Sequence, residues 1–105
     1  MFVYIREAHP SDSNWADQKL KVADPRTQVQ RNQVATRCAK DLSFTLPMVI
    51  DDMKDTVNQL YRAWPERMYV IDRDGKIAFK GGIGPFGFKP AEAEAALKKL
   101  LDSDN

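Results

Sequence analysis

The chain has 105 residues, a length that suits one small domain. Its 16 Lys and Arg residues nearly balance 15 Asp and Glu residues, so no basic excess indicates a nucleic-acid or anionic-membrane partner. No apolar run approaches the roughly 20 residues of a membrane span, and the first residues lack the apolar segment of a signal peptide.

Cysteine and histidine each occur once, as Cys38 and His9. An intrachain disulfide and a Cys-x-x-Cys redox pair are therefore excluded, and no metal site is expected. Chemistry without disulfides predicts a reducing compartment, which we take to be the cytoplasm.

Strand and helix patterns alternate along the chain and end in a hairpin and a helix, which predicts an α/β fold in a single domain over residues 1–105. In chain order, the expected elements are a strand over residues 2–6, a loop over 9–25, a helix over 27–42, a strand over 46–50, a helix over 53–64, strands over 67–72 and 76–80, and a helix over 90–101.

Boundary signals accompany these elements. Thr27 can cap the first helix, and Asp51 or Asp52 the second. Pro47 places its strand at a sheet edge because proline donates no backbone hydrogen bond. Asp74-Gly75 is a usual pair for a hairpin turn.

Apolar residues at helical spacing predict the core-facing side of each helix. In the first helix they are Val34, Cys38 and Leu42. In the second they are Met53, Val57, Leu60, Tyr61 and Trp64, with Pro65 ending the helix. In the last helix, which Pro90 begins, they are Ala93, Ala96, Leu97, Leu100 and Leu101.

Three candidate sites have competing interpretations. Gly82, Gly84 and Gly87 satisfy G-x-G-x-x-G, but Pro85 removes a backbone N–H and no further strand carries an acidic residue, so a structural loop is favoured over nucleotide binding. Cys38 is either a buried apolar residue or a nucleophile with a pKa lowered by neighbouring cations.

The third candidate pairs His9 with Glu7. Residues two apart in an extended segment share a face, so the carboxylate could orient a proton-donating imidazole. The alternative is a surface histidine in a polar loop.

Three collinear blocks resemble the iodothyronine deiodinases. Residues 3–12 (VYIREAHPSD) resemble the family pattern Y-I-x-E-A-H-x-S-D, and residues 60–69 (LYRAWPERMY) and 80–88 (KGGIGPFGF) resemble two later blocks. Because no membrane anchor precedes them, the chain is similar to a bacterial deiodinase-like protein.

This resemblance implies a thioredoxin-like three-layer fold and reductive removal of iodide from an iodinated phenolic ring, with an external thiol as reductant and no bound cofactor. It implies that His9 and Glu7 are catalytic. It also implies that Tyr4, Ser11 and Pro65 contact the substrate, with Pro65 at the cis-proline position.

The family's selenocysteine or cysteine nucleophile lies in a strand–loop–helix unit before the Tyr-Ile strand, and Cys38 does not match it. We therefore expect residues 1–105 to be the carboxy-terminal portion of the domain, truncated and inactive alone; one route to the truncation is a selenocysteine codon read as a stop. The missing central strand would leave two strand edges unpaired, which predicts a homodimer or a strand-swapped oligomer.

Two further functions stay open besides the deiodinase-like oxidoreductase. One is a non-catalytic thioredoxin-fold interaction domain that has kept the scaffold. The other is a general thiol oxidoreductase or peroxidase that acts on a substrate without iodine.

Overall fold

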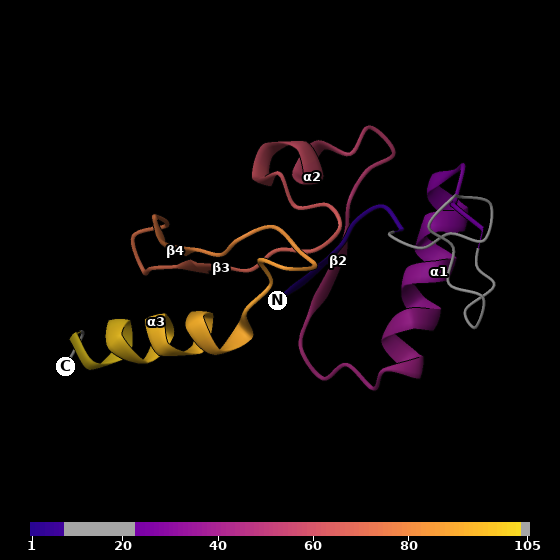
Figure 1. Ribbon diagram of the computed structural model, residues 1–105. Coiled ribbons are helices and arrows are strands. Elements are labelled where there is room, and N and C mark those ends of the chain that lie inside the picture. Colours follow the sequence, from indigo (N-terminus) through magenta and orange to yellow (C-terminus); the bar gives the residue numbers. More distant parts are fainter. Residues whose placement is uncertain (8–22, 104–105) are drawn as a thin grey trace. The chain divides into compact units, whose positions relative to one another are not determined.

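The computed structural model describes residues 1–7 and 23–103 and forms four short strands and three helices within them (Figure 1). The order is β1 (Phe2–Tyr4), α1 (Gln28–Asp41), β2 (Met48–Ile50), α2 (Thr56–Tyr61), β3 (Tyr69–Ile71), β4 (Ile77–Lys80) and α3 (Pro90–Ser103). The predicted α/β class is confirmed. The chain divides into two compact units, Met1–Arg62 and Ala63–Asn105.

The first unit is built on a parallel pair of strands, β1 and β2. The Phe2 N–H donates to the Pro47 carbonyl at 2.9 Å, and the Asp51 N–H donates to the Tyr4 carbonyl at 2.8 Å. Parallel strands need a long crossover, and α1 supplies it and packs against β2. Pro47 precedes β2 and serves only as an acceptor there, so its missing N–H removes no bond of the ladder.

The first helix starts where the sequence predicts. Thr27 is extended and its Oγ1 accepts a hydrogen bond from the Gln30 N–H at 3.1 Å. The prediction for its core-facing side is wrong at Leu42, which is 62% exposed. The buried residues of α1 are Arg31 and Ala35, which lie on a neighbouring row of the helix. Arg31 is buried there because its guanidinium donates to the Asp52 carbonyl and pairs with the Asp55 carboxylate.

The second helix is much shorter than the predicted one. Asp55 and Arg62 both have left-handed backbone conformations, and these bound α2 to six residues. The helix therefore ends before Pro65. The predicted apolar residues over 53–64 therefore do not all lie on one helix, and their common core-facing side is not formed. No residue of α2 is buried, and Leu60 is 77% exposed.

The second unit begins with an antiparallel hairpin of β3 and β4. The predicted turn is confirmed, since Gly75 has a φ of +80° and the Asp72 carboxylate accepts the N–H groups of Asp74 and Lys76 at 2.9 Å. The last helix, α3, packs against both strands (Figure 1).

The apolar core of the second unit is small. Val70 on β3 and Ala93 on α3 are its buried hydrophobic residues among those that the structure describes. Ala96 and Leu100 are half-buried, but Leu97 and Leu101 are exposed, contrary to the prediction. A two-stranded hairpin is narrow and covers one row of α3 instead of the broad face that a larger sheet would cover.

Candidate functional site

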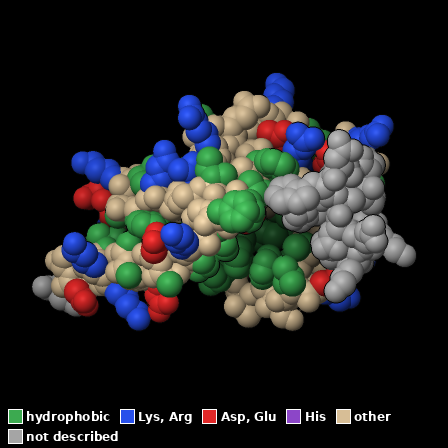
Figure 2. Space-filling view, viewed as in Figure 1, with side chains coloured by type: hydrophobic (Ala, Val, Ile, Leu, Met, Phe, Trp, Pro, Cys, Tyr) green, Lys and Arg blue, Asp and Glu red, His purple; other side chains and the backbone are tan. Residues whose placement is uncertain are grey.

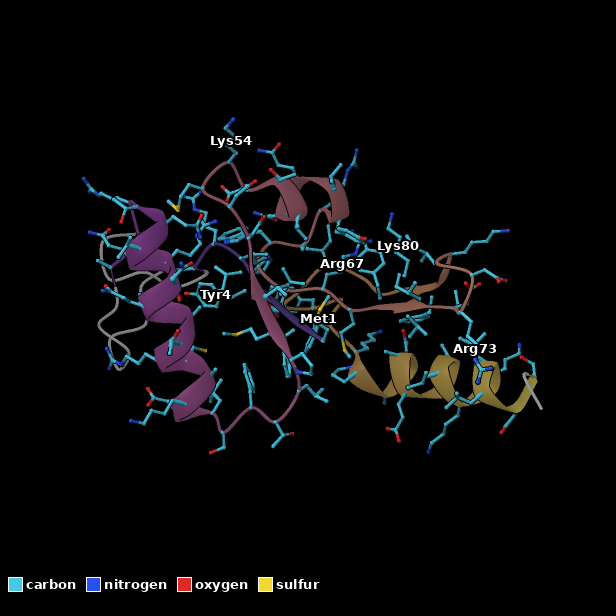
Figure 3. All side chains as sticks on the ribbon, turned by 180° about the vertical axis from the view of Figure 1, so that it is seen from behind. Met1, Tyr4, Lys54, Arg67, Arg73 and Lys80 are labelled. Atoms are coloured by element: carbon cyan, nitrogen blue, oxygen red, sulfur yellow. The ribbon has the colours of Figure 1, made fainter. Side chains whose placement is uncertain are left out.

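The carboxyl end of β1 carries two of the predicted site residues. Tyr4 is the last residue of β1 and Glu7 follows three residues later, and both side chains are half-buried. The Tyr4 hydroxyl donates a hydrogen bond to the Glu7 carboxylate. Figure 3 shows Tyr4 on the side of β1 toward α1. The bond fixes a carboxylate where the strand ends.

A buried polar network supports this strand end. The Asp51 carboxylate, directly after β2, accepts the N–H groups of Asp52, Val57 and Asn58 at 2.9–3.0 Å. The Asp51 N–H donates to the Tyr4 carbonyl, so the same residue holds the start of α2 and the end of β1. These bonds compensate for the burial of the Asp51 carboxylate, which is 2% exposed.

Arg31 extends the network from α1. Its guanidinium donates to the Asp52 carbonyl at 2.5 Å and lies 3.0 Å from the Asp55 carboxylate. A buried guanidinium is tolerated only when acceptors surround it. The network is therefore structural, and it fixes the end of β1 relative to α1.

Cys38 lies half-buried on α1. Burial raises the pKa of the Cys38 thiol, and the negative charges of Glu7 and Asp41 raise this pKa further. A thiol with a raised pKa carries little thiolate near neutral pH, and the thiolate is the nucleophilic form. The geometry thus favours the interpretation of Cys38 as an apolar packing residue.

The remaining predicted site residues are His9, Ser11 and Pro65. His9 and Ser11 lie outside the described residues, so the His9–Glu7 pair stays a prediction. Pro65 belongs to the second unit, is half-buried and follows a cis peptide bond from Trp64.

The glycine loop of the second unit uses its N–H groups internally. Gly81 donates to the Met68 carbonyl at 2.9 Å, Gly84 to that of Glu66 at 3.0 Å, and Gly87 to that of Ile83 at 2.9 Å. These three N–H groups are therefore not free to bind a phosphate, as a dinucleotide site would need.

Glu66 is a residue of this loop region to which the sequence analysis assigned no role. A Cβ built on Gly84 would lie 2.2 Å from Glu66 Oε1 and 2.9 Å from its Cγ, so the carboxylate occupies the space that a side chain at residue 84 would fill. No periodicity or spacing in the sequence predicts this contact, because the two residues are far apart in the chain.

Neither a metal site nor a membrane-spanning helix is found among the residues that the structure describes. Within residues 1–7 and 23–103, no three His, Cys, Asp or Glu side chains gather in a way that could hold a metal ion. In the same ranges, no helix has the length and apolar character that crossing a membrane requires.

Comparisons with known proteins place the chain near one family. A sequence model described as "Iodothyronine deiodinase" matches residues 1–101. The type I iodothyronine deiodinase of Xenopus laevis is 35% identical over 99 residues, which cover 94% of this chain and 38% of that protein.

Two further relatives have similar sequence identities and coverages. The thyroxine 5-deiodinase of Gallus gallus is 33% identical over 98 residues, covering 92% of this chain and 37% of that protein. That of Sparus aurata is 33% identical over 102 residues, covering 94% and 37%. The chain thus spans well under half the length of the curated relatives it matches, all of which are vertebrate proteins here.

Proposed function

Since the chain belongs to the iodothyronine deiodinase family, we propose that it carries the proton-donating part of a thiol- or selenol-dependent reductive deiodinase. The observation that supports this most directly is the hydrogen bond from Tyr4 to the Glu7 carboxylate, inside the block that resembles the family pattern. The carboxylate is thereby held two residues before His9, the proposed proton donor.

The chemistry explains these residue types. A soft sulfur or selenium nucleophile takes iodine from the aromatic ring, and the ring carbon keeps the electron pair of the broken bond and accepts a proton. An external thiol then attacks the chalcogen–iodine bond, releases iodide and forms a mixed disulfide or selenenyl sulfide. A second thiol regenerates the nucleophile. The net result is two thiols oxidised to one disulfide and one aryl iodide reduced.

Each proposed residue has a distinct part. His9 donates the proton, and Glu7 orients its imidazole and stabilises the protonated form. Tyr4, whose hydroxyl is bound to Glu7, acts through that carboxylate as well as forming one wall of the substrate site. Ser11 and Pro65 are proposed substrate contacts.

The nucleophile is proposed to come from outside residues 1–105. Cys38 is the one thiol of the sequence, and its raised pKa makes it a poor nucleophile. We therefore propose that these residues alone release no iodide. We also propose a cytoplasmic location, because a reduced thiol or selenol is needed for each turnover and the sequence has no cysteine pair.

The proposed complete fold is thioredoxin-like. The parallel pair β1–β2 and the antiparallel pair β3–β4 are small sheets of the kinds such a fold contains. Pairs of strands are marginal alone, so we propose that a homodimer or a strand-swapped oligomer adds strands to them. Light scattering tests this, and a compact monomer at every concentration would rule the oligomer out.

Iodide release tests the function. The chain, incubated with an iodinated tyrosine or thyronine and dithiothreitol, should release no iodide, and Cys38→Ser should change nothing. The DNA before Met1 should continue the reading frame through a selenocysteine or cysteine codon.

In the product of that longer frame, His9→Ala should reduce the rate by about 10²–10⁴-fold, the usual contribution of a general acid. Tyr4→Phe should reduce the rate by less. Thr45→Ala, at an exposed residue of the first unit, should leave the rate unchanged. Iodide release by the chain alone that Cys38→Ser abolishes would contradict the proposal, because it would make Cys38 the nucleophile.

A further inference from the structure

Asp51 is a buried acidic residue of the first unit. Figure 2 shows Asp and Glu side chains at the molecular surface, where water solvates them. Asp51 is instead 2% exposed, and its carboxylate accepts the N–H groups of Asp52, Val57 and Asn58 at 2.9–3.0 Å. The burial of a carboxylate is unfavourable unless bonds of this kind replace water. These bonds hold the main chain of residue 51 against the start of α2.

The two main-chain polar groups of Asp51 bind two other elements. Its N–H donates to the carbonyl of Tyr4 at 2.8 Å, at the end of β1. Its carbonyl accepts a hydrogen bond at 3.3 Å from Nε2 of Gln28, the first residue of α1. Because α2 holds the carboxylate, neither main-chain group can shift without the loss of a hydrogen bond that burial makes costly to lose. One residue thus joins β1, α1 and α2.

The end of β1 also carries groups that the proposed function uses. Tyr4 is the last residue of β1, and its hydroxyl donates to the Glu7 carboxylate. The carbonyl that binds the Asp51 N–H and the hydroxyl that binds Glu7 belong to this one tyrosine. The position of the Glu7 carboxylate relative to α1 and α2 therefore depends on Asp51.

An ion pair joins the same two parts of the chain. Arg6, after β1, lies 3.4 Å from the carboxylate of Asp24, which precedes α1. The Arg6 side chain is 55% exposed, and an ion pair with an exposed partner is weak. The buried hydrogen bonds of Asp51 consequently provide the stronger connection between the end of β1 and the start of α1.

We propose that Asp51 is a positioning residue, which holds the Glu7 carboxylate, through Tyr4, where it can orient the proposed proton donor. The inference rests on the proposed function and adds to it a residue that acts only through other residues. A misplacement of about 1 Å in a reacting group can reduce a rate by about 10²-fold, so a residue that fixes the strand end matters to the reaction.

The pKa of His9 tests this inference in the intact chain, without nucleophile, reductant or substrate. His9 is the one histidine of the sequence, so proton NMR can follow its imidazole unambiguously as the pH is varied. A neighbouring carboxylate stabilises the protonated form. The pKa of His9 in the wild type should therefore lie above that of a free histidine side chain, and Glu7→Gln should remove this rise.

The decisive variant is Asp51→Glu. It keeps the negative charge, but its longer side chain no longer fits the three N–H groups, so it should remove most of the rise in the pKa of His9. Asp52→Glu is the matched control, because it makes the same change one residue later, at an exposed carboxylate that accepts the Thr56 N–H at 3.0 Å. It disturbs the start of the same helix and should leave the pKa of His9 unchanged.

A second variant keeps the test decisive if Asp51→Glu does not fold. Gln28→Met removes the amide that donates to the Asp51 carbonyl and should lower the pKa of His9 in the same direction, by a smaller amount. An unchanged pKa in this variant would then overturn the proposal.

The outcomes separate this inference from the proposed function. If Glu7→Gln lowers the pKa of His9 and a folded Asp51→Glu does not, Asp51 has no positioning role, and the proposed function stands. If Asp52→Glu lowers it as much as Asp51→Glu, the effect comes from helix stability, and the inference is again wrong. If Glu7→Gln changes nothing, the His9–Glu7 pair of the proposed function fails, and this inference fails with it.

Discussion

The two units of the chain are stabilised by different interactions. In Met1–Arg62, a parallel strand pair and two helices meet at buried charged groups, Arg31 and Asp51, which bind backbone atoms of other elements. In Ala63–Asn105, a hairpin and a helix share a small apolar core, and the following loop closes through backbone hydrogen bonds between glycines and carbonyls.

The difference follows from how the strands are connected. A hairpin joins its strands through a short turn, so local backbone bonds define it. A parallel pair is joined through a crossover helix, and other contacts must hold that helix in place. We therefore expect the stability of the first unit to depend on a few polar side chains and that of the second unit to depend on glycines.

The largest effect should come from Arg31. Arg31→Met removes the buried guanidinium and leaves the Asp55 carboxylate without its cation, which should cost about 3–5 kcal/mol of unfolding free energy. Denaturant titration measures it. Arg37→Met, which breaks an exposed pair with Asp41 on the same helix, should cost at most about 0.5 kcal/mol.

Amide hydrogen exchange of the same Arg31 variant sharpens the comparison. Protection should fall in residues 1–7 and 23–62 and stay unchanged in the β3–β4 hairpin and α3. Equal loss in both units would show that they unfold together, and the distinction between them would then be structural alone.

In the second unit, Gly87→Ala should destabilise by about 1–3 kcal/mol, the usual cost of overpacking. The new Cβ would lie 2.5 Å from the Ile83 carbonyl oxygen, which is backbone and cannot move aside easily. Gly75→Asn is the matched control, because nothing lies within 4 Å of its Cβ and asparagine tolerates a positive φ. If thermal unfolding showed the same loss of stability for Gly87→Ala and Gly75→Asn, a steric reason for glycine at residue 87 would be contradicted.

A smaller effect is expected at the start of α1. Thr27→Ala removes the acceptor of the Gln30 N–H and should cost about 1 kcal/mol. Thr36→Ala, in the middle of the same helix, removes only a hydroxyl that donates to the Asn32 carbonyl and should be close to neutral. Circular dichroism during denaturant titration compares them.

The smallest effect concerns acid stability. The side-chain and backbone hydrogen bonds from Thr56 lower the pKa of the Asp52 carboxyl below its ordinary value. A carboxyl with a lowered folded-state pKa contributes stability above its unfolded pKa of about 3.9, and this contribution is lost as the pH falls through the folded-state pKa.

Melting temperatures of the wild type and of Asp52→Asn should therefore differ at pH 6 and converge toward about pH 2. A constant difference across this range would assign the effect of the substitution to packing and not to the charge.

The candidate site was predictable in part. The block that includes β1 predicted roles for Tyr4 and Glu7; the structure joins their side chains by a hydrogen bond, and their roles stay a prediction. That block could not identify Glu66, whose position against Gly84 depends on the path of the loop after β4. The polar core around Arg31 was also missed, because an arginine on the buried face of a helix has no signature in an apolar pattern.

The sequence by itself determined the element types, the Thr27 cap, the Asp74-Gly75 turn and the family. Caps and turns depend on a few adjacent residues, and the family is identified by motifs that stand in the sequence itself. Tertiary structure alone decided which helix faces are buried and how short α2 is. Burial depends on the width of the opposing sheet. Among residues 1–7 and 23–103 each sheet has two strands, and several apolar residues that the helical pattern directs inward lie exposed to solvent.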